Sequence, residues 1–186
     1  MAIFKSAYDA LTFAYNFNGT NCTHAMIGEI PKGTGKGLGG LDGAAEAGNI
    51  KRIVCSKGAD VEAVVVAKFA PHIIPRSISK GWYVSIGWLS AIRHLARLAE
   101  KKCFAGSGDE EYRGRIIAKV FGREKEAITD IGEKASIPRA TAYRHFKAAR
   151  RYILGGRTGD KGILQTAIDA IDDEFRMMGI VGNEDD

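Results

Sequence analysis

Hydrophobic residues recur every three or four positions along most of the chain, which is the period of an amphipathic α-helix. The clearest stripe consists of Trp88, Ile92, Leu95 and Ala99, and the cations of that segment lie mostly off it. Stripes of the same period predict further helices over residues 3–17, 109–121 and 160–178. Asp109 is a suitable N-cap for the second of these, and Gly122 follows its end.

The segments between these stripes are less periodic. Residues 42–56 read as a helix that Asp42 caps and Gly58 ends. In residues 60–70 the valines favour a strand, whereas the length and the capping favour a helix, which is our interpretation. Residues 71–81, PHIIPRSISKG, read as a turn or connector because they contain two prolines.

The order of these elements predicts an all-α fold, because neither a βαβ alternation nor an internal repeat is visible. We expect a helical N-terminal region, residues 1–104, that contacts a partner and contains a Gly-rich loop over residues 18–43. The sequence AGSG at 105–108 resembles a linker. We expect a DNA-binding domain over residues 109–179 and an acidic tail over residues 180–186.

The charge is distributed unevenly. The 186 residues contain 27 Lys and Arg against 22 Asp and Glu, a net charge of +5. Residues 169–186 contain seven acids and one base, a net charge of −6, so the preceding residues carry +11. Such an imbalance favours a body that binds a polyanion.

Other function classes find little support in the sequence. No apolar stretch reaches the ~18 residues of a membrane span, and the first residues lack the pattern of a secretory signal, so we expect a cytoplasmic protein. The three cysteines are far apart and read as reduced core thiols. Cys22 and His24 could share a metal, but a second ligand pair is missing, so we predict neither a metal nor a cofactor. Gly37 follows Gly35 and Lys36 where a phosphate-binding loop needs Ser or Thr.

Residues 127–147, AITDIGEKASIPRATAYRHFK, meet the requirements of a helix-turn-helix. Gly132 supplies the small residue at which two helices can cross closely, and residues 136–138 supply the break between them. Pro138 suits the start of the second helix because its missing N–H is not needed there. The predicted small core consists of Ile131, Ala135, Ile137, Ala142 and Phe146.

The second helix presents cations and hydrogen-bonding side chains without any acid, which suits the major groove of DNA. Arg144 is the best candidate for a bidentate contact to guanine. The alternative is a solvated basic helix of a bundle. The predicted DNA-binding residues are Arg139, Thr141, Tyr143, Arg144, Lys147, Arg150 and Arg151.

The segment SIPRATAYRHF resembles the turn and recognition helix of tetracycline-repressor type regulators and of serine invertases. Its continuation KAARRYIL is more similar to region 4 of sigma factors. Two positions depart from the usual motif: Ser136 stands where Gly is usual, and Ala142 stands where a β-branched residue is usual. The motif lies too far from the N-terminus for the first family, and residues 1–104 lack the βα pattern of a recombinase.

Residues 111–155 resemble the C-terminal helix-turn-helix of phage late-gene antitermination proteins of the Q type. The likeness lies in Tyr112, the Ile116 and Ile117 pair, Phe121 with Gly122, and the extended basic helix. It implies a bacteriophage transcription factor that binds double-stranded DNA beside a late promoter in a bacterial cell, engages RNA polymerase and lets it pass terminators. A plain helix-turn-helix repressor or activator is the alternative.

An enzyme is not expected, because no catalytic motif surrounds the histidines. The partner of the N-terminal region could be a second copy of the chain, as in a homodimer, or RNA polymerase. His145 could contact phosphate or simply pack in the core. Trp82 and Tyr83 could stack on a base, but burial is expected for at least one of them.

Overall fold

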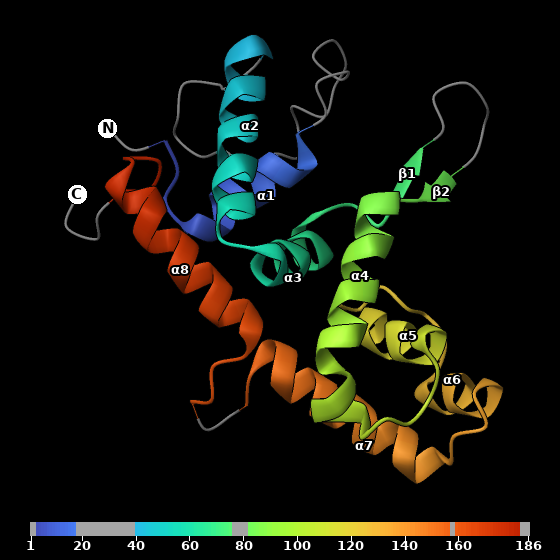
Figure 1. Cartoon of the computed structure of the whole chain (residues 1–186). Coiled ribbons are helices and arrows are strands. Elements are labelled where there is room, and N and C mark those ends of the chain that lie inside the picture. The colour runs from blue at the N-terminus through green and yellow to red at the C-terminus, as the bar shows by residue number, and fades with distance from the viewer. Residues whose placement is uncertain (1–2, 18–39, 76–81, 157–158, 183–186) are drawn as a thin grey trace.

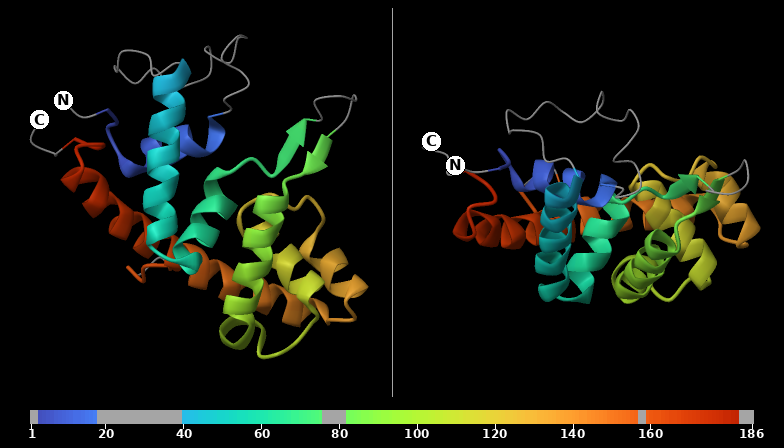
Figure 2. Two further views of the ribbon diagram at one scale, coloured as in Figure 1. Left: turned by 45° about the horizontal axis from the view of Figure 1, so that its top comes forward. Right: turned by 90° about the horizontal axis from the view of Figure 1, so that it is seen from above.

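The computed structural model describes residues 3–17, 40–75, 82–156 and 159–182. The predicted all-α fold is confirmed, since helices dominate the described residues and one short hairpin is their only regular sheet. The elements form two groups that lie at opposite ends of the molecule (Figures 1 and 2). Helices from the two ends of the chain form the terminal group, and helices from the middle of the chain form the central group.

In the terminal group, helices from both ends of the chain pack together. The group contains α1 (Ala7–Asn16), α2 (Gly40–Ser56), α3 (Ala59–Phe69) and α8 (Ile163–Met177). Helix α8 packs against both α1 and α3. The ends of the chain meet because the amide of Phe4 donates to the carbonyl of Ile180 at 2.9 Å, and that of Gly182 donates to the carbonyl of Phe4 at 3.2 Å.

The central group contains the predicted DNA-reading segment. It consists of α4 (Ile86–Ala99), the π-helical turn η2 (Glu100–Phe104), α5 (Glu110–Val120), α6 (Ile128–Lys134) and α7 (Arg139–Leu154). Helix α4 joins the two groups, because it packs on α3 and on α5.

Local capping explains where several helices begin. Ser6, Ser85 and Asp109 each accept a hydrogen bond from the backbone amide three residues later, at the first turn of α1, α4 and α5. The Trp88 stripe is buried as predicted, and the Trp88 indole N–H donates to the carbonyl of Ala67 at 3.2 Å. This bond ties α4 to α3.

The segment 71–81, predicted as a connector, contains a strand in its described part, while residues 76–81 lie outside the described residues. Strand β1 (Ile73–Pro75) pairs antiparallel with β2 (Trp82–Val84), with Ile73 opposite Val84. The expectation that Trp82 or Tyr83 is buried was wrong, because both side chains are exposed. Neither a three-residue strand nor its pairing produces a periodic signal that could be read from one sequence.

Three predicted segment boundaries were also wrong. Helix α2 begins at Gly40, so the end of the predicted loop 18–43 is helical, while residues 18–39 lie outside the described residues. Ile180 and Val181 are buried in the core and do not belong to an acidic tail. Helix α1 starts at Ala7 instead of Ile3, because the residues before it are extended beside Ile180.

One hydrophobic core extends through both groups. The segment 105–108, expected as a linker, is a turn in which Ala105, Gly106 and Gly108 have positive φ. A Cβ atom at Gly108 would lie 2.3 Å from the Tyr112 ring, so the turn packs tightly on α5. Contacts therefore cross the predicted division between residues 104 and 109.

The cysteines differ in their surroundings. Cys103 is buried, and burial raises the pKa of its thiol. Cys55, expected in the core, is exposed, and its Sγ lies 3.4 Å from Oε1 of Glu62. Cys22 lies outside the described residues.

Candidate nucleic-acid interface

Helices α6 and α7 lie where the sequence predicts the two helices of the motif, and a four-residue turn joins them. Within the turn, the amide of Ile137 donates to the carbonyl of Gly132 at 2.8 Å, and that of Ser136 donates to the carbonyl of Glu133 at 3.0 Å. Ser136 has a φ of 56°, the left-handed conformation that explains why glycine is usual at this position.

Gly132 lies at a close contact between α6 and α7. A Cβ atom at this position would lie 3.0 Å from both the Cβ of Ala142 and the carbonyl oxygen of Ile137. Real Cβ atoms rarely come so close to another atom, so a side chain here requires the two helices to move apart. The same contact explains why a small residue, Ala142, faces Gly132 from α7.

One face of α7 is buried against α5 and α6. It consists of Ala142, His145, Ala149 and Ile153. The side chains of Ile137 and Phe146 pack on the same core and are partly buried, as predicted. The helix is therefore held from one side only.

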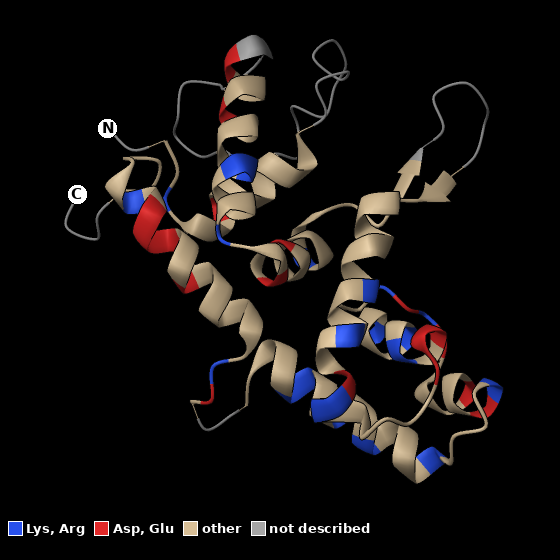
Figure 3. Ribbon diagram, viewed as in Figure 1, with Lys and Arg blue, Asp and Glu red and all other residues tan. Residues whose placement is uncertain are grey.

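The opposite face of α7 is exposed and carries the predicted DNA-binding side chains. Six of the seven are exposed, and Thr141 is partly buried. The exposed members share a helical face because they recur at spacings of three and four. They are Arg139, Tyr143, Arg144, Lys147, Arg150 and Arg151. Figure 3 shows many Lys and Arg positions along the ribbon of the central group and a run of Asp and Glu positions on α8.

Two of these arginines have partners within the chain. The Arg139 guanidinium lies 5.9 Å from the centre of the Tyr143 ring. Arg151 pairs with Asp160, which precedes α8, and its Nε lies 3.1 Å from Oδ2. Arg151 is thus directed toward its own chain, and we expect it to contribute less to a nucleic-acid contact than the other cations of α7.

A cation outside the set of predicted DNA-binding residues also approaches α7. The Lys102 ammonium, from η2, lies 4.9 Å from the centre of the Tyr152 ring. The two residues are fifty positions apart, so no local pattern could have placed them together. Lys102 adds positive charge beside the C-terminal half of α7.

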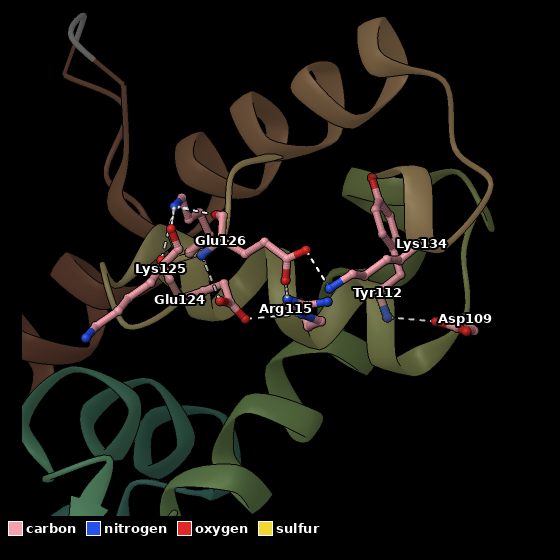
Figure 4. A network of polar contacts seen from close by, with 8 residues as sticks. Asp109, Tyr112, Arg115, Glu124, Lys125, Glu126 and Lys134 are labelled. Atoms are coloured by element: carbon pink, nitrogen blue, oxygen red, sulfur yellow. Dashed lines mark hydrogen bonds and ion pairs between the residues drawn. The ribbon is translucent and has the colours of Figure 1, made fainter. Parts of the chain in front are cut away.

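A polar network secures the loop that leads from α5 into α6 (Figure 4). Arg115 pairs with Glu124 and Glu126, and the ammonium of Lys134 lies 2.7 Å from Oε1 of Glu126. Hydrogen bonds from Lys134 and then from Arg115 hold the pKa of Glu126 below its usual range. The Lys119 ammonium donates to the carbonyl of Glu126 at 2.7 Å. These contacts connect α5 and α6 with the loop and thereby orient α6.

His145 is a core residue, which decides between the two roles considered for it. It is 3% exposed, and its Nδ1 lies 3.0 Å from the hydroxyl of Tyr112. The Phe104 ring packs edge-on against the rings of both. The cluster joins η2, α5 and α7, and it excludes His145 from a surface that could contact phosphate.

We expect the protein to lose stability as the pH falls below about 6.5, the usual pKa of histidine. Burial, and secondarily the positive charge of Arg144, lower the pKa of His145 in the folded state. Below pH 6.5 the unfolded chain binds a proton that the folded chain resists, so stability is present above this pH and is lost as the pH falls toward the folded pKa. Each unit of difference corresponds to about 1.4 kcal/mol.

Chemical unfolding between pH 5 and pH 8 measures this effect, with His145→Gln as the matched control. The variant lacks the titrating group, so its stability should change less with pH than that of the wild type. Equal pH dependence of the two proteins would contradict the assignment to His145.

No protein-family model, no curated protein and no solved structure matches the chain. The part of the chain that the structure describes contains no group of three or more His, Cys, Asp or Glu side chains that could hold a metal ion. No helix of that part is long and apolar enough to cross a membrane. His94, which lacks a catalytic motif, lies 2.7 Å from Oδ1 of Asp60 and links α4 to α3.

Proposed function

We propose that this chain is a sequence-specific DNA-binding transcription regulator that reads DNA with α7. The observation that supports it best is the division of α7 into a buried face and an exposed basic face. The helix has sixteen residues and contains no acid. The B-DNA major groove is about 12 Å wide and admits a helix presented in this way.

The N-terminal half of α7 is the proposed base-reading part. In a helix-turn-helix, the first residues of the second helix reach the base edges, and later residues meet the phosphates. Arg139, Tyr143 and Arg144 occupy that half and are exposed. Lys147 and Arg150 follow on the same face and suit phosphate contacts.

Arg144→Ala should relax base discrimination by about 1–3 kcal/mol, because a bidentate contact to guanine is lost. The measurement is the affinity of wild type and variant for a selected duplex and for a scrambled duplex of the same length. Arg52→Ala is the matched control: it removes the same charge from an exposed position on α2, in the other group.

The solvated-helix alternative makes a different prediction. Under it, selection from random duplexes enriches no sequence, and wild type and Arg144→Ala bind cognate and scrambled duplexes equally. That result would contradict DNA reading by α7.

The resemblance of residues 111–155 to Q-type proteins supports a narrower proposal, which is transcription antitermination. Contact with RNA polymerase belongs to this proposal and depends on the resemblance alone. Transcription in vitro across a terminator, with and without the protein, tests it. Readthrough that depends on the DNA site supports antitermination, whereas DNA binding without readthrough supports a plain repressor or activator.

A further inference from the structure

A cavity lies at the junction between the terminal group and the central group. Its volume is about 610 Å³, and its walls come from α3 and α8 on one side and from η2 and α7 on the other. Pockets that hold small molecules in proteins measure about 300–1,000 Å³. We call this space the junction cavity. It borders the C-terminal half of α7, apart from the proposed base-reading part.

The walls of the junction cavity are mostly apolar. Val61 belongs to α3, Ala148 to α7, and Ile163 and Ala167 to α8. Helices normally pack without voids larger than a water molecule, so a space of this size between four elements is unusual. Apolar side chains around such a space lack contact partners on one side. A ligand with an apolar body would supply these contacts.

The cavity is also lined by charged side chains, three of them basic and two acidic. Both acids have a partner within the chain. Asp160 pairs with Arg151, and Oδ1 of Asp60 lies 2.7 Å from Nε2 of His94. The charged lining residues are Asp60, Lys102, Arg151, Asp160 and Lys161.

Lys102 is the cation of the cavity that stays available to a ligand. Arg151 pairs with a carboxylate, and so does Lys161, whose ammonium lies 2.7 Å from Oδ2 of Asp169. Lys102 is exposed, and no carboxylate of the described residues pairs with it. Its ammonium lies over the ring of Tyr152, which also lines the cavity. An anionic group of a ligand would therefore find an unpaired ammonium next to an apolar wall.

We propose that the junction cavity binds a small organic carboxylate with an apolar body. The carboxylate would pair with Lys102, and the body would lie against Val61, Ala148 and Ile163. The inference rests on the proposed function only for its effect on DNA. There the bound anion adds negative charge beside the C-terminal half of α7 and weakens its attraction for phosphates. The binding of the carboxylate itself is tested without DNA.

Calorimetric titration of the full-length protein with 1-naphthylacetate tests the charged part of the site. The wild type is expected to bind this aromatic carboxylate at least about tenfold more tightly than 1-naphthylacetamide, which has the same shape but no charge. Lys102→Met should remove that preference. Lys101→Met is the matched control, because Lys101 is the neighbouring exposed cation of η2 and does not line the cavity.

A second variant tests the apolar part of the site. Ala170 lines the cavity from an exposed position on α8, so Ala170→Trp should occupy the space without disturbing the core. It should weaken the binding of 1-naphthylacetate at least about tenfold, while circular dichroism shows an unchanged helix content. The proposal is overturned if the wild type does not bind at millimolar concentrations, or if either Lys102→Met or Ala170→Trp binds as the wild type does.

A DNA arm separates this proposal from the proposed function. Duplexes are titrated with the protein in saturating 1-naphthylacetate and in the same concentration of acetate, which keeps the ionic strength constant. The affinity for DNA is expected to fall about threefold in 1-naphthylacetate. If 1-naphthylacetate binds while the protein binds no DNA, the cavity site stands and the DNA-binding proposal fails. If the affinity for DNA is equal in both salts, the effect of the cavity on α7 is overturned.

Discussion

The proposed affinity of the protein for DNA should fall about tenfold between 50 and 200 mM salt, as expected when about two cations displace counterions from phosphates. The estimate follows from the exposed face of α7. Lys147 and Arg150 are exposed and suit phosphate contacts, whereas Arg139 and Arg144 lie in the proposed base-reading half and Arg151 pairs with Asp160. Two phosphate neutralisations give a slope of about −1.8 in a plot of the logarithm of the association constant against that of the salt concentration.

The change of slope caused by each single substitution measures how much that cation contributes to the salt dependence. Lys147→Ala should reduce its magnitude by about 0.9 and weaken binding to all sequences alike. Arg151→Ala should change it less, because Asp160 already neutralises that guanidinium. Arg52→Ala, in the terminal group, should leave it unchanged. A flat plot for the wild type would exclude phosphate contacts by α7 as the source of binding.

The parts of the fold that could be predicted depend on neighbours in sequence. Asp109 caps α5 as predicted, because an N-cap acts on an amide three residues away. Gly132 was predicted at a close approach of two helices because the turn that follows it brings α7 back across α6. Both effects operate within about ten residues, and a single sequence contains all the information that they require.

The parts that could not be predicted depend on residues far apart in the chain. The Tyr112 hydroxyl meets His145 across 33 positions, and Lys102 meets Tyr152 across fifty. Val181 follows an acidic segment, yet it is buried because Phe4 pairs with it from the other end of the chain. Local composition misleads in such cases, since long-range packing decides burial.

The exposed hairpin illustrates the same limit for the candidate site. Burial of Trp82 or Tyr83 is a sound expectation for aromatic residues in general. It failed because β1 and β2 project from the start of α4, where no other described element covers them. The exposed hairpin is therefore a surface that the periodicity of the sequence alone could not have identified.

Gly132→Val should destabilise the protein by about 3 kcal/mol and impair DNA binding with it. The Cβ of valine would contact Ala142 Cβ and the Ile137 carbonyl at about 3.0 Å, and its methyl groups would add further overlap. Glycine is otherwise a poor helix residue, so a valine without this clash should be neutral or slightly better.

Gly48→Val provides that comparison. Gly48 lies in α2, and a Cβ there meets no atom within 4 Å. Chemical unfolding of the two variants should therefore give free energies that differ by about 3 kcal/mol, with Gly48→Val within about 0.5 kcal/mol of the wild type. Comparable stabilities of the two variants would show that α6 and α7 do not approach at Gly132.

The close contact can also be isolated with smaller changes. In a double-mutant cycle of Gly132→Ala and Ala142→Gly, the second substitution removes the Cβ atom that opposes the first. We expect the double variant to be more stable than the sum of the single effects predicts, by about 1 kcal/mol, with the remaining cost due to the Ile137 carbonyl. Strict additivity would mean that the two positions are not in contact. The buried face of α7 alone holds this helix in place. The Ala142→Gly substitution that relieves the close contact should therefore restore DNA affinity together with stability.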